Sequence, residues 1–202
     1  METILIMGAS LMEYGYSSHW VSRLADAYAR KAFVYNAGLA GYNSDWLHSI
    51  LISDTLSTRL VPASMQRPLF ITLMVGSNDC SHGLQHVPLA RYKKNLHDII
   101  DLLCQRFHPR LGVLVLSIPP IDEVRWPIGK MKKTDRTFAD SLRYSEAMKE
   151  VVQGVQAAPR LPGGSVFRHL LPRYTGKIRY RHPQVRQTRT MDPFVLRRTA
   201  RE

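Results

Sequence analysis

The feature that most constrains the fold is a set of short runs in which nearly every residue is apolar and which stop at a glycine or a proline. The runs are "TILIMG", "AFVYNAG", "PLFITLMVG" and "LGVLVLSIPP". Strands covered on one face alternate apolar and polar residues, whereas continuous apolar runs are typical of a parallel sheet covered on both faces. Segments with helical spacing lie between the runs. This order predicts an α/β fold, a three-layer α/β/α sandwich around a parallel sheet of four or five strands.

The spacing of apolar residues and the capping residues set approximate limits for each element. Ser17 or Ser18 is expected to cap one helix, Asn43 or Ser44 another, and Pro88 is expected to start a third. The expected strands are 3–8, 32–38, 68–79 and 111–120, with "SVFRHLL" at 165–171 as a candidate fifth, and the expected helices are 17–31, 43–56, 88–107 and 137–158. Sites in such sheets lie beyond the carboxyl ends of the strands.

The basic residues of the chain are unevenly distributed. The 202 residues carry a formal net charge of +12, but residues 159–202 hold 11 of the 28 Lys and Arg residues and two of the 16 Asp and Glu residues. Residues 1–158 therefore hold 17 basic and 14 acidic residues, a net charge of +3. We expect one domain over residues 1–158. Over residues 159–202 we expect a basic tail that is disordered or unlike a native end, so that the C-terminal part of the fold is incomplete.

Composition also bears on the cellular setting and the partners. No apolar stretch approaches the roughly 20 residues of a membrane span, and no basic leader precedes the first run, so neither a span nor a signal peptide is expected. Cys80 and Cys104 lack metal-binding or redox spacing and are expected to be reduced thiols, which favours a cytoplasmic location. No cofactor, metal or specific nucleic acid is expected, and no heptad pattern indicates an oligomeric state.

Residues that suit acyl transfer follow three of the runs. Ser10 could act as a nucleophile, and its backbone N–H could donate to an oxyanion. Gly41 could supply a second N–H, because a residue without a side chain lets a substrate approach the backbone. The amide of Asn78 could supply a third donor without adding charge. Each also has a plain structural explanation, since a serine after a strand is usually a helix cap and glycine and asparagine are ordinary turn residues.

Taken together, these turns resemble the blocks of the SGNH, or GDSL, hydrolase superfamily. "MGASLMEYG" is similar to the first block, "NAGLAGYNSDW" to the second and "VGSNDCSHGLQHVPLARYKKNL" to the third. The resemblance implies a flavodoxin-like sheet, Ser10 as the nucleophile, and Gly41 and Asn78 as oxyanion donors. "GYNSDW", "GSND" before "QHVPLARYKKNL", and "VLSIPPIDE" look like the isoamyl acetate-hydrolysing esterase branch, and the resemblance covers about residues 3–155.

Two features depart from the superfamily's pattern. Ala9 stands where the family usually has an aspartate that supports the first block. The family's last block, Asp-x-x-His, supplies the catalytic base and the carboxylate that orients it, and the basic tail has no such block. The histidines of the tail are His169 and His182, and Val166 and Arg179 stand three residues before them.

His82 is a weak candidate for the missing base, which is left unassigned. Asp79 precedes it at the spacing of the last block, but this segment is fused to the Asn78 block, which in the family forms a loop on the asparagine side of the site. His82 and His86 are therefore expected to be solvated loop residues. The simplest interpretation is that the tail is not a normal end for this fold, which fits a frameshifted, alternatively spliced or misassembled reading of the gene. A true divergent tail stays open as an alternative.

Three functions are open for this sequence. The first is a carboxylic-ester hydrolase that acts on small acyl or acetyl esters through Ser10, and that is inactive as written if the base is absent. The second is a catalytically dead relative that binds acyl ligands in the pocket of Ser10, Gly41 and Asn78. The third, a binder of nucleic acid or of an anionic surface through the tail, is less favoured, because the tail has no basic amphipathic helix and no zinc-ligand spacing.

Overall fold

The computed structural model describes residues 1–65, 67–123, 135–157 and 168–170. Within these ranges five strands form one parallel sheet in the order β2-β1-β3-β4-β5. The strands are β1 (Glu2–Gly8), β2 (Ala32–Gly38), β3 (Phe70–Met74), β4 (Val113–Leu116) and β5 (Arg168–Leu170). The helices are α1 (Ser10–Glu13), α2 (Trp20–Ala27), α3 (Ser44–Ile52), α4 (Asp54–Leu60), α5 (Leu89–Phe107) and α6 (Phe138–Ala157), with the 3-10 helix η1 (Ala63–Met65). The predicted parallel α/β sandwich is confirmed.

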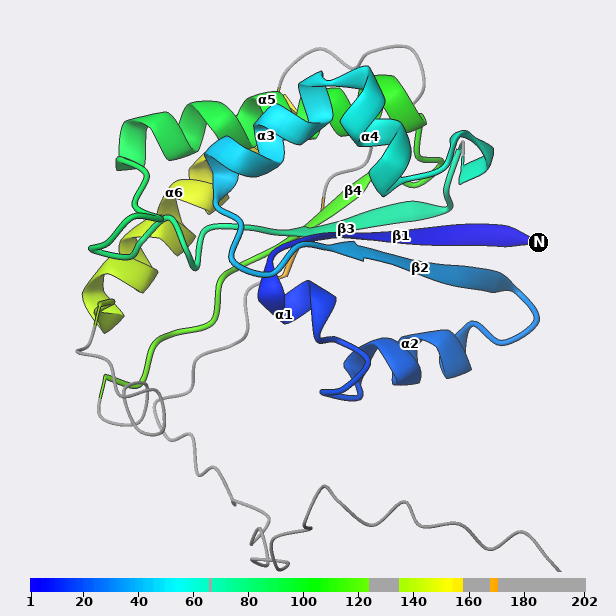
Figure 1. Cartoon of the computed structure of the whole chain (residues 1–202), viewed down its shortest axis with the longest axis horizontal. Coiled ribbons are helices and arrows are strands. Elements are labelled where there is room, and N and C mark those ends of the chain that lie inside the picture. The colour runs from blue at the N-terminus through cyan, green and yellow to red at the C-terminus, as the bar shows by residue number, and fades with distance from the viewer. Residues whose placement is uncertain (66, 124–134, 158–167, 171–202) are drawn as a thin grey trace, which may run out of the picture. The chain divides into compact units, whose positions relative to one another are not determined.

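Helices cover both faces of this sheet. In Figure 1, α3, α4, α5 and α6 lie on one side of the strands, and α1 and α2 lie on the other. Because each helix carries the chain back before the next parallel strand, the carboxyl ends of the strands gather at one edge of the sheet. The turns after these strands are therefore neighbours in space, although they are far apart in the sequence.

The larger hydrophobic core lies between the sheet and the layer that contains α5. Leu5 and Leu73 from neighbouring strands are fully buried in it. One face of α5 is buried against them at helical spacing, and its apolar members are Tyr92, Leu96, Ile99, Ile100, Leu103, Cys104 and Phe107. Burying one large apolar side chain stabilises the fold by about 1.5–3 kcal/mol. A smaller cluster of Ile6, Met12 and Val21 packs α1 and α2 on the opposite face.

The start of one expected helix differs from the sequence prediction, and the start of another agrees with it. α2 is not capped by Ser17 or Ser18, because both hydroxyls donate to the carbonyl of Tyr14. Its N-cap is His19, which has a φ of 67° and makes no side-chain capping bond. α5 begins directly after Pro88, as expected.

The single helix expected over residues 43–56 is two helices. Asn43 caps α3, as expected, and its side chain accepts a hydrogen bond of 3.0 Å from the backbone N–H of Trp46. Ser53 then adopts an extended conformation, and its hydroxyl accepts from the N–H of Leu56 at the start of α4. A break between two helices costs little free energy when a serine side chain accepts a hydrogen bond from a free N–H at the start of the second helix.

β5 extends the sheet beyond the domain boundary expected at residue 158. It pairs in parallel with β4, with Leu170 opposite Leu116, so the candidate strand in "SVFRHLL" is confirmed. The other residues of the basic tail lie outside the described ranges. The division of the chain into residues 1–158 and 159–202 therefore stays a prediction.

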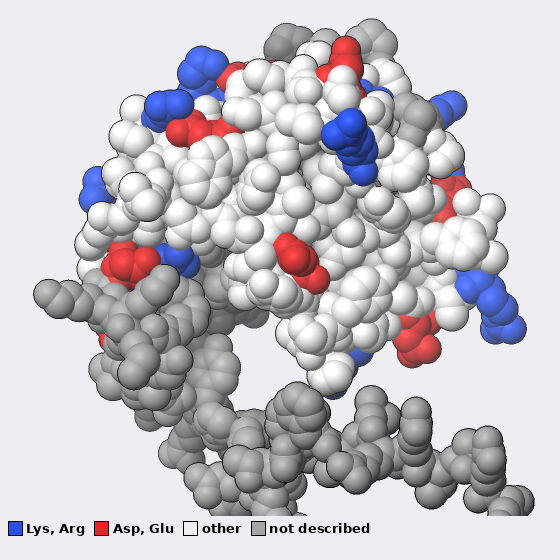
Figure 2. All heavy atoms as spheres, in the orientation of Figure 1, with Lys and Arg blue, Asp and Glu red and all other residues white. Residues whose placement is uncertain are grey.

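Charged side chains of both signs are interspersed on the face of the described residues that Figure 2 draws. On the face drawn in Figure 2 they alternate around the rim and no single sign gathers, as the small net charge of residues 1–158 suggests. No helix within the described ranges is long and apolar enough to cross a membrane. Cys80 and Cys104 are buried and form no disulfide, in agreement with the expectation of reduced thiols.

Candidate active site

Ser10 lies where β1 passes into the short helix α1. β1 ends at Gly8, Ala9 is the N-cap and Ser10 is the first helical residue, so the serine is not the helix cap. The N–H of Ala9 donates to the carbonyl of Met74 over 3.3 Å and connects the end of β1 to the end of β3. This turn places a half-buried serine at the carboxyl edge of the sheet.

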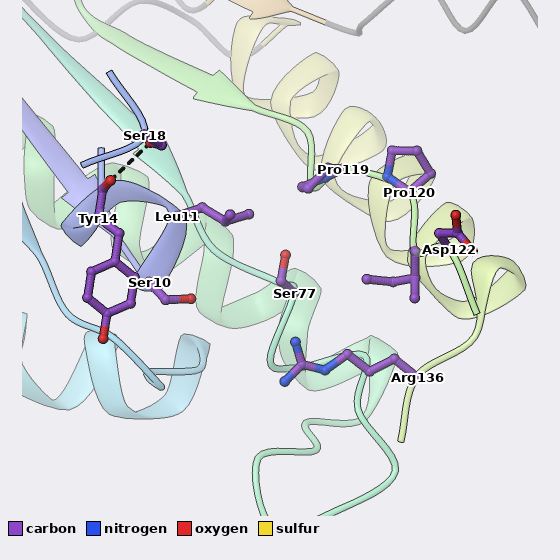
Figure 3. Close-up of a pocket in the computed structure, with 10 residues that line it drawn as sticks. Ser10, Leu11, Tyr14, Ser18, Ser77, Pro119, Pro120, Asp122 and Arg136 are labelled. Carbon is purple, nitrogen blue, oxygen red and sulfur yellow. Dashed lines mark hydrogen bonds between the residues drawn. The ribbon is translucent and has the colours of Figure 1, made fainter. Parts of the chain in front are cut away.

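Ser10 lines a cavity of about 540 Å³. In Figure 3 the lining side chains come from the segments that follow β1, β3 and β4 and from the residue ahead of α6. They are Ser10, Leu11, Tyr14, Ser18, Ser77, Pro119, Pro120, Ile121, Asp122 and Arg136. The cavity is of the size that takes a small molecule. Its position beyond the strand ends is the one predicted for a parallel sheet.

Two backbone N–H groups near this edge are unused. Within the described residues, the N–H groups of Ser10 and Gly41 donate to no hydrogen bond. Gly41 has a φ of 82°, and a Cβ there would come no closer than 3.6 Å to the side chain of Gln85. The left-handed backbone, and not lack of space, is what requires glycine at this position. Free N–H groups in such turns are what an oxyanion site needs.

Asn78 is buried, and its amide is held at both ends. Nδ2 donates to the carbonyl of Tyr42 over 2.7 Å, and Oδ1 accepts from Nη2 of Arg136 over 2.9 Å. The structure thus joins the third block directly to the turn of the second block, next to Gly41. An amide nitrogen has two hydrogens, and the Tyr42 carbonyl occupies one of them.

Arg136 and Gln85 complete this arrangement. Nη2 of Arg136 also donates to Oε1 of Gln85 over 3.2 Å, and Nε2 of Gln85 donates to the carbonyl of Gly41 over 2.6 Å. Arg136 is 7% exposed and lines the Ser10 cavity. Sequence reasoning missed both residues. The sequence does not show whether an arginine just ahead of a helix is buried or solvated. Gln85 stands in "QHV", which contributed only to the resemblance to the isoamyl acetate-hydrolysing esterase branch.

Asp79, the neighbour of Asn78, is fully buried and supports α3. Its Oδ1 accepts from the N–H of Ser44 over 2.9 Å. The hydroxyl of Ser44 in turn accepts from Nδ2 of Asn95 over 2.9 Å. Burial raises the pKa of Asp79 to about 6, and the bonds from Ser44 oppose that rise. Through this hydrogen bond, Asp79 of the third block connects to the start of α3 in the second block, and its side chain lies in the core.

Among the described residues that line the Ser10 cavity, neither His82 nor His86 is found. His82 is exposed, and its Nε2 lies 2.8 Å from Oδ2 of Asp140 on α6. The hydroxyl of Thr137 and the ring of His82 both lower the pKa of Asp140. His86 is exposed, as expected for a loop residue. His169 lies in β5, and His182 lies outside the described residues.

Comparison with known proteins gives matches in sequence and in fold. The model of the GDSL-like Lipase/Acylhydrolase family matches residues 6–184. The isoamyl acetate-hydrolyzing esterase 1 homolog of Mus musculus is 35% identical over 61% of this chain and 50% of its own length. The homolog of Rattus norvegicus is 32% identical over 74% of this chain and 62% of its own length. The chain therefore spans less than two thirds of either relative.

Solved structures share the fold at low sequence identity. An acetyl xylan esterase of Geobacillus stearothermophilus superposes with a TM-score of 0.56 and 17% identity over 82% of this chain and 75% of that chain. A lipase/acylhydrolase of Enterococcus faecalis gives a TM-score of 0.56 and 19% identity over 77% and 73%. These likenesses support the sheet order, and the match of the family model extends over most of the chain. The chain belongs to the GDSL-like lipase/acylhydrolase family, and its sequence relatives lie in the isoamyl acetate-hydrolysing esterase branch.

Proposed function

We propose that the chain is a carboxylic-ester hydrolase of the serine type that acts on small acyl or acetyl esters. Ser10 is the nucleophile, and the oxyanion donors are its own N–H, the N–H of Gly41 and the amide of Asn78. The observation that carries the proposal is that Ser10 lines a cavity at the strand ends, while the N–H groups of Ser10 and Gly41 have no acceptor within the described residues. Relatives named as esterases support the same chemistry.

The chemistry follows the usual course of acyl transfer. The Ser10 oxygen would attack the ester carbonyl carbon and pass its proton to a base, the alcohol would leave, and water would then release the acid. The cavity is lined by the polar residues Ser10 and Ser77 and by apolar residues that include Leu11 and Ile121. An apolar wall beside a nucleophile favours a short, uncharged acyl or alcohol group. The proposed partner is therefore a small-molecule ester.

No general base is assigned for Ser10, so we propose that the turnover of esters is low. His82 has a carboxylate partner in Asp140, as a base oriented by a third group requires, but it does not line the cavity of Ser10. The missing Asp-x-x-His block also supports the second candidate, a ligand-binding relative that retains the cavity without turnover.

Binding of nucleic acid through the basic tail has no support from the described residues. Cys80 and Cys104, which are buried and form no disulfide, support a cytoplasmic location.

Covalent labelling of Ser10 tests the proposal. A fluorophosphonate probe is expected to label the chain at Ser10, and Ser10→Ala is expected to abolish both labelling and any hydrolysis of short-chain aryl acetates. Ser22→Ala is a matched control, because Ser22 is an exposed serine of α2 whose hydroxyl donates to the carbonyl of Tyr16. Labelling that persists in Ser10→Ala would refute the assignment of the nucleophile. Binding of acyl ligands without labelling would favour the second candidate.

A further inference from the structure

We infer that Arg136 is the positioning residue of the oxyanion site, acting through the side chains of Asn78 and Gln85. The inference rests on the proposed function, because an oxyanion site matters only if Ser10 attacks an acyl group. Arg136 precedes α6, whereas Asn78 and Gln85 lie between β3 and α5. A single guanidinium nitrogen, Nη2, donates to both amide oxygens, over 2.9 Å and 3.2 Å.

The chemistry of the guanidinium fixes the direction of both amides. Arginine has donors and no acceptor, so Oδ1 of Asn78 and Oε1 of Gln85 must face it. Their NH₂ groups must then face away, and both find backbone carbonyls. Asn78 donates to Tyr42 over 2.7 Å, and Gln85 donates to Gly41 over 2.6 Å. Without the arginine, either amide could rotate and present oxygen where the site needs a donor.

These two bonds hold consecutive peptide units of the turn that presents Gly41. The carbonyls of Gly41 and Tyr42 are both fixed, so the turn cannot rotate freely about its left-handed glycine, where φ is 82°. The N–H of Gly41 is thereby aimed in one direction while it stays unpaired within the described residues. Preorganised donors of this kind act without reorganisation when the oxyanion forms.

Burial strengthens the effect of the charge. A buried arginine is rare unless it is paired, and Arg136 is 7% exposed. Hydrogen bonds from a charged donor are about twice as strong as neutral ones, and they polarise the amides that accept them. In Figure 3 the guanidinium extends toward Ser77 and Ser10, so its positive charge also faces the cavity in which an oxyanion would form.

The test compares Arg136→Met and Arg136→Lys with Arg106→Met in the full chain. Arg106 is a matched control, because it also makes side-chain hydrogen bonds, to Ser57 and Asp54. Arg106 lies near the C-terminal end of α5, about 25 Å along the helix axis from its first residue, Leu89. Two quantities are measured: the rate constant for labelling of Ser10 by a fluorophosphonate, and the solvent exchange of the Asn78 and Gln85 side-chain NH₂ groups by ¹H–¹⁵N NMR.

Arg136→Met is expected to slow labelling at least tenfold and to speed the exchange of both NH₂ groups at least tenfold. Arg136→Lys keeps the charge but replaces the rigid, planar guanidinium by a flexible ammonium group, and it should give intermediate values. Arg106→Met should stay within twofold of the parent chain. Unchanged NH₂ exchange or unchanged labelling in a folded Arg136→Met would overturn the inference, since a merely structural role would lower stability without changing either quantity. If Arg136→Met does not fold, Arg136→Lys decides on the same two quantities.

The two proposals fail in different ways. If the parent chain is not labelled at all, the proposed nucleophile fails, and the NH₂ exchange alone then decides whether Arg136 holds the two amides. If the parent chain is labelled and Arg136→Met is labelled equally fast, the positioning role fails while the proposed function stands.

Discussion

Asp79 is a buried carboxyl that connects the segment after β3 to the start of α3. Its side chain is fully buried, and one oxygen, Oδ1, accepts from the N–H of Ser44 at the start of α3. The other oxygen, Oδ2, has no hydrogen-bond partner within the described residues. Because burial disfavours the charged carboxylate, the pKa of Asp79 rises to about 6 from 3.8. The residue therefore exerts a pH-dependent effect on the stability of the fold.

The sign of this effect gives a prediction for Asp79→Asn. Between about pH 4 and pH 6 the folded chain binds more protons at Asp79 than the unfolded chain, so stability falls as pH rises through this window. A shift of roughly two pKa units corresponds to about 3 kcal/mol. The free energy of unfolding of the parent chain, relative to Asp79→Asn, should therefore decrease by about that amount from pH 4 to pH 7. Urea denaturation at several pH values measures this difference, and a constant or rising difference would contradict the prediction.

At this scale, motifs in the sequence single out Ser10, Gly41 and Asn78, whose catalytic roles stay predictions, and they miss the residues that only tertiary contacts bring to the site. Ser10, Gly41 and Asn78 each follow a strand, and strand ends are recognisable because apolar runs stop there. Arg136 reaches Asn78 across 58 positions in the sequence, and Gln85 reaches Gly41 across 44. No local pattern encodes such partners. Their burial becomes visible only when α6 and the loop before α5 are packed together.

At the scale of elements, β2 determines where α1 lies and hence where Ser10 lies. Nδ2 of Asn36 in β2 donates to the carbonyl of Met12 over 2.7 Å, near the end of α1. Gly38, the last residue of β2, lies so close to α1 that a Cβ there would overlap the backbone of Glu13. The absence of a side chain at Gly38 therefore lets α1, which carries Ser10, dock on the sheet.

Gly38→Ala is expected to lower the free energy of unfolding by about 1–3 kcal/mol, because backbone atoms must shift to admit the methyl group. It should also slow labelling of Ser10, since α1 moves with its backbone. Gly154→Ala is the control: this exposed position in α6 has nothing within 4 Å of an added Cβ. Alanine there should stabilise the chain by about 1 kcal/mol through helix propensity. Equal effects of the two changes in urea denaturation would show that close packing at Gly38 is unimportant.

The elements that the sequence prediction missed are short or interrupted. α1 has four residues, too few to show a period of 3.6 residues, so "SLME" looked like part of a turn. α3 and α4 share an apolar pattern that continues through Ser53, and only the extended backbone of that residue separates them. Long elements such as β1 and α5 were predicted well, because burial on a sheet leaves a pattern over many residues.

At the scale of the whole molecule, the fold and the catalytic block rest on different parts of the chain. Strands β1 to β4, the cavity and the proposed oxyanion donors all lie within the described residues up to Arg136 and the helix after it. The family's Asp-x-x-His block, as the resemblance places it, belongs after a fifth strand. β5 is present at Arg168–Leu170, and the sequence that follows it contains no Asp-x-x-His. Residues 171–202 therefore supply no such block, and the proposed nucleophile lies in a different part of the chain.

This combination predicts that base supply, and not the Ser10 site, limits activity. A serine hydroxyl is a weak nucleophile at neutral pH. Sites that lose a triad member retain only about a thousandfold advantage over water from binding and oxyanion donors. We therefore expect little hydrolysis of short-chain aryl acetates by the chain as it stands. Replacing residues 171–202 with a family segment that carries Asp-x-x-His, while keeping β5, should raise turnover by several orders of magnitude.

The graft has two controls and one outcome that would contradict it. Changing the grafted histidine to alanine, or Ser10 to alanine, should return turnover to the low level of the parent chain, because nucleophile and base act as a unit. Brisk hydrolysis by the unmodified chain would show that another base is already present. The variants His82→Ala, His169→Ala and His182→Ala then locate it, and loss of activity in His82→Ala alone would assign the role to His82, paired with Asp140. Hydrolysis that survives all three changes would place the base outside the histidines considered for it.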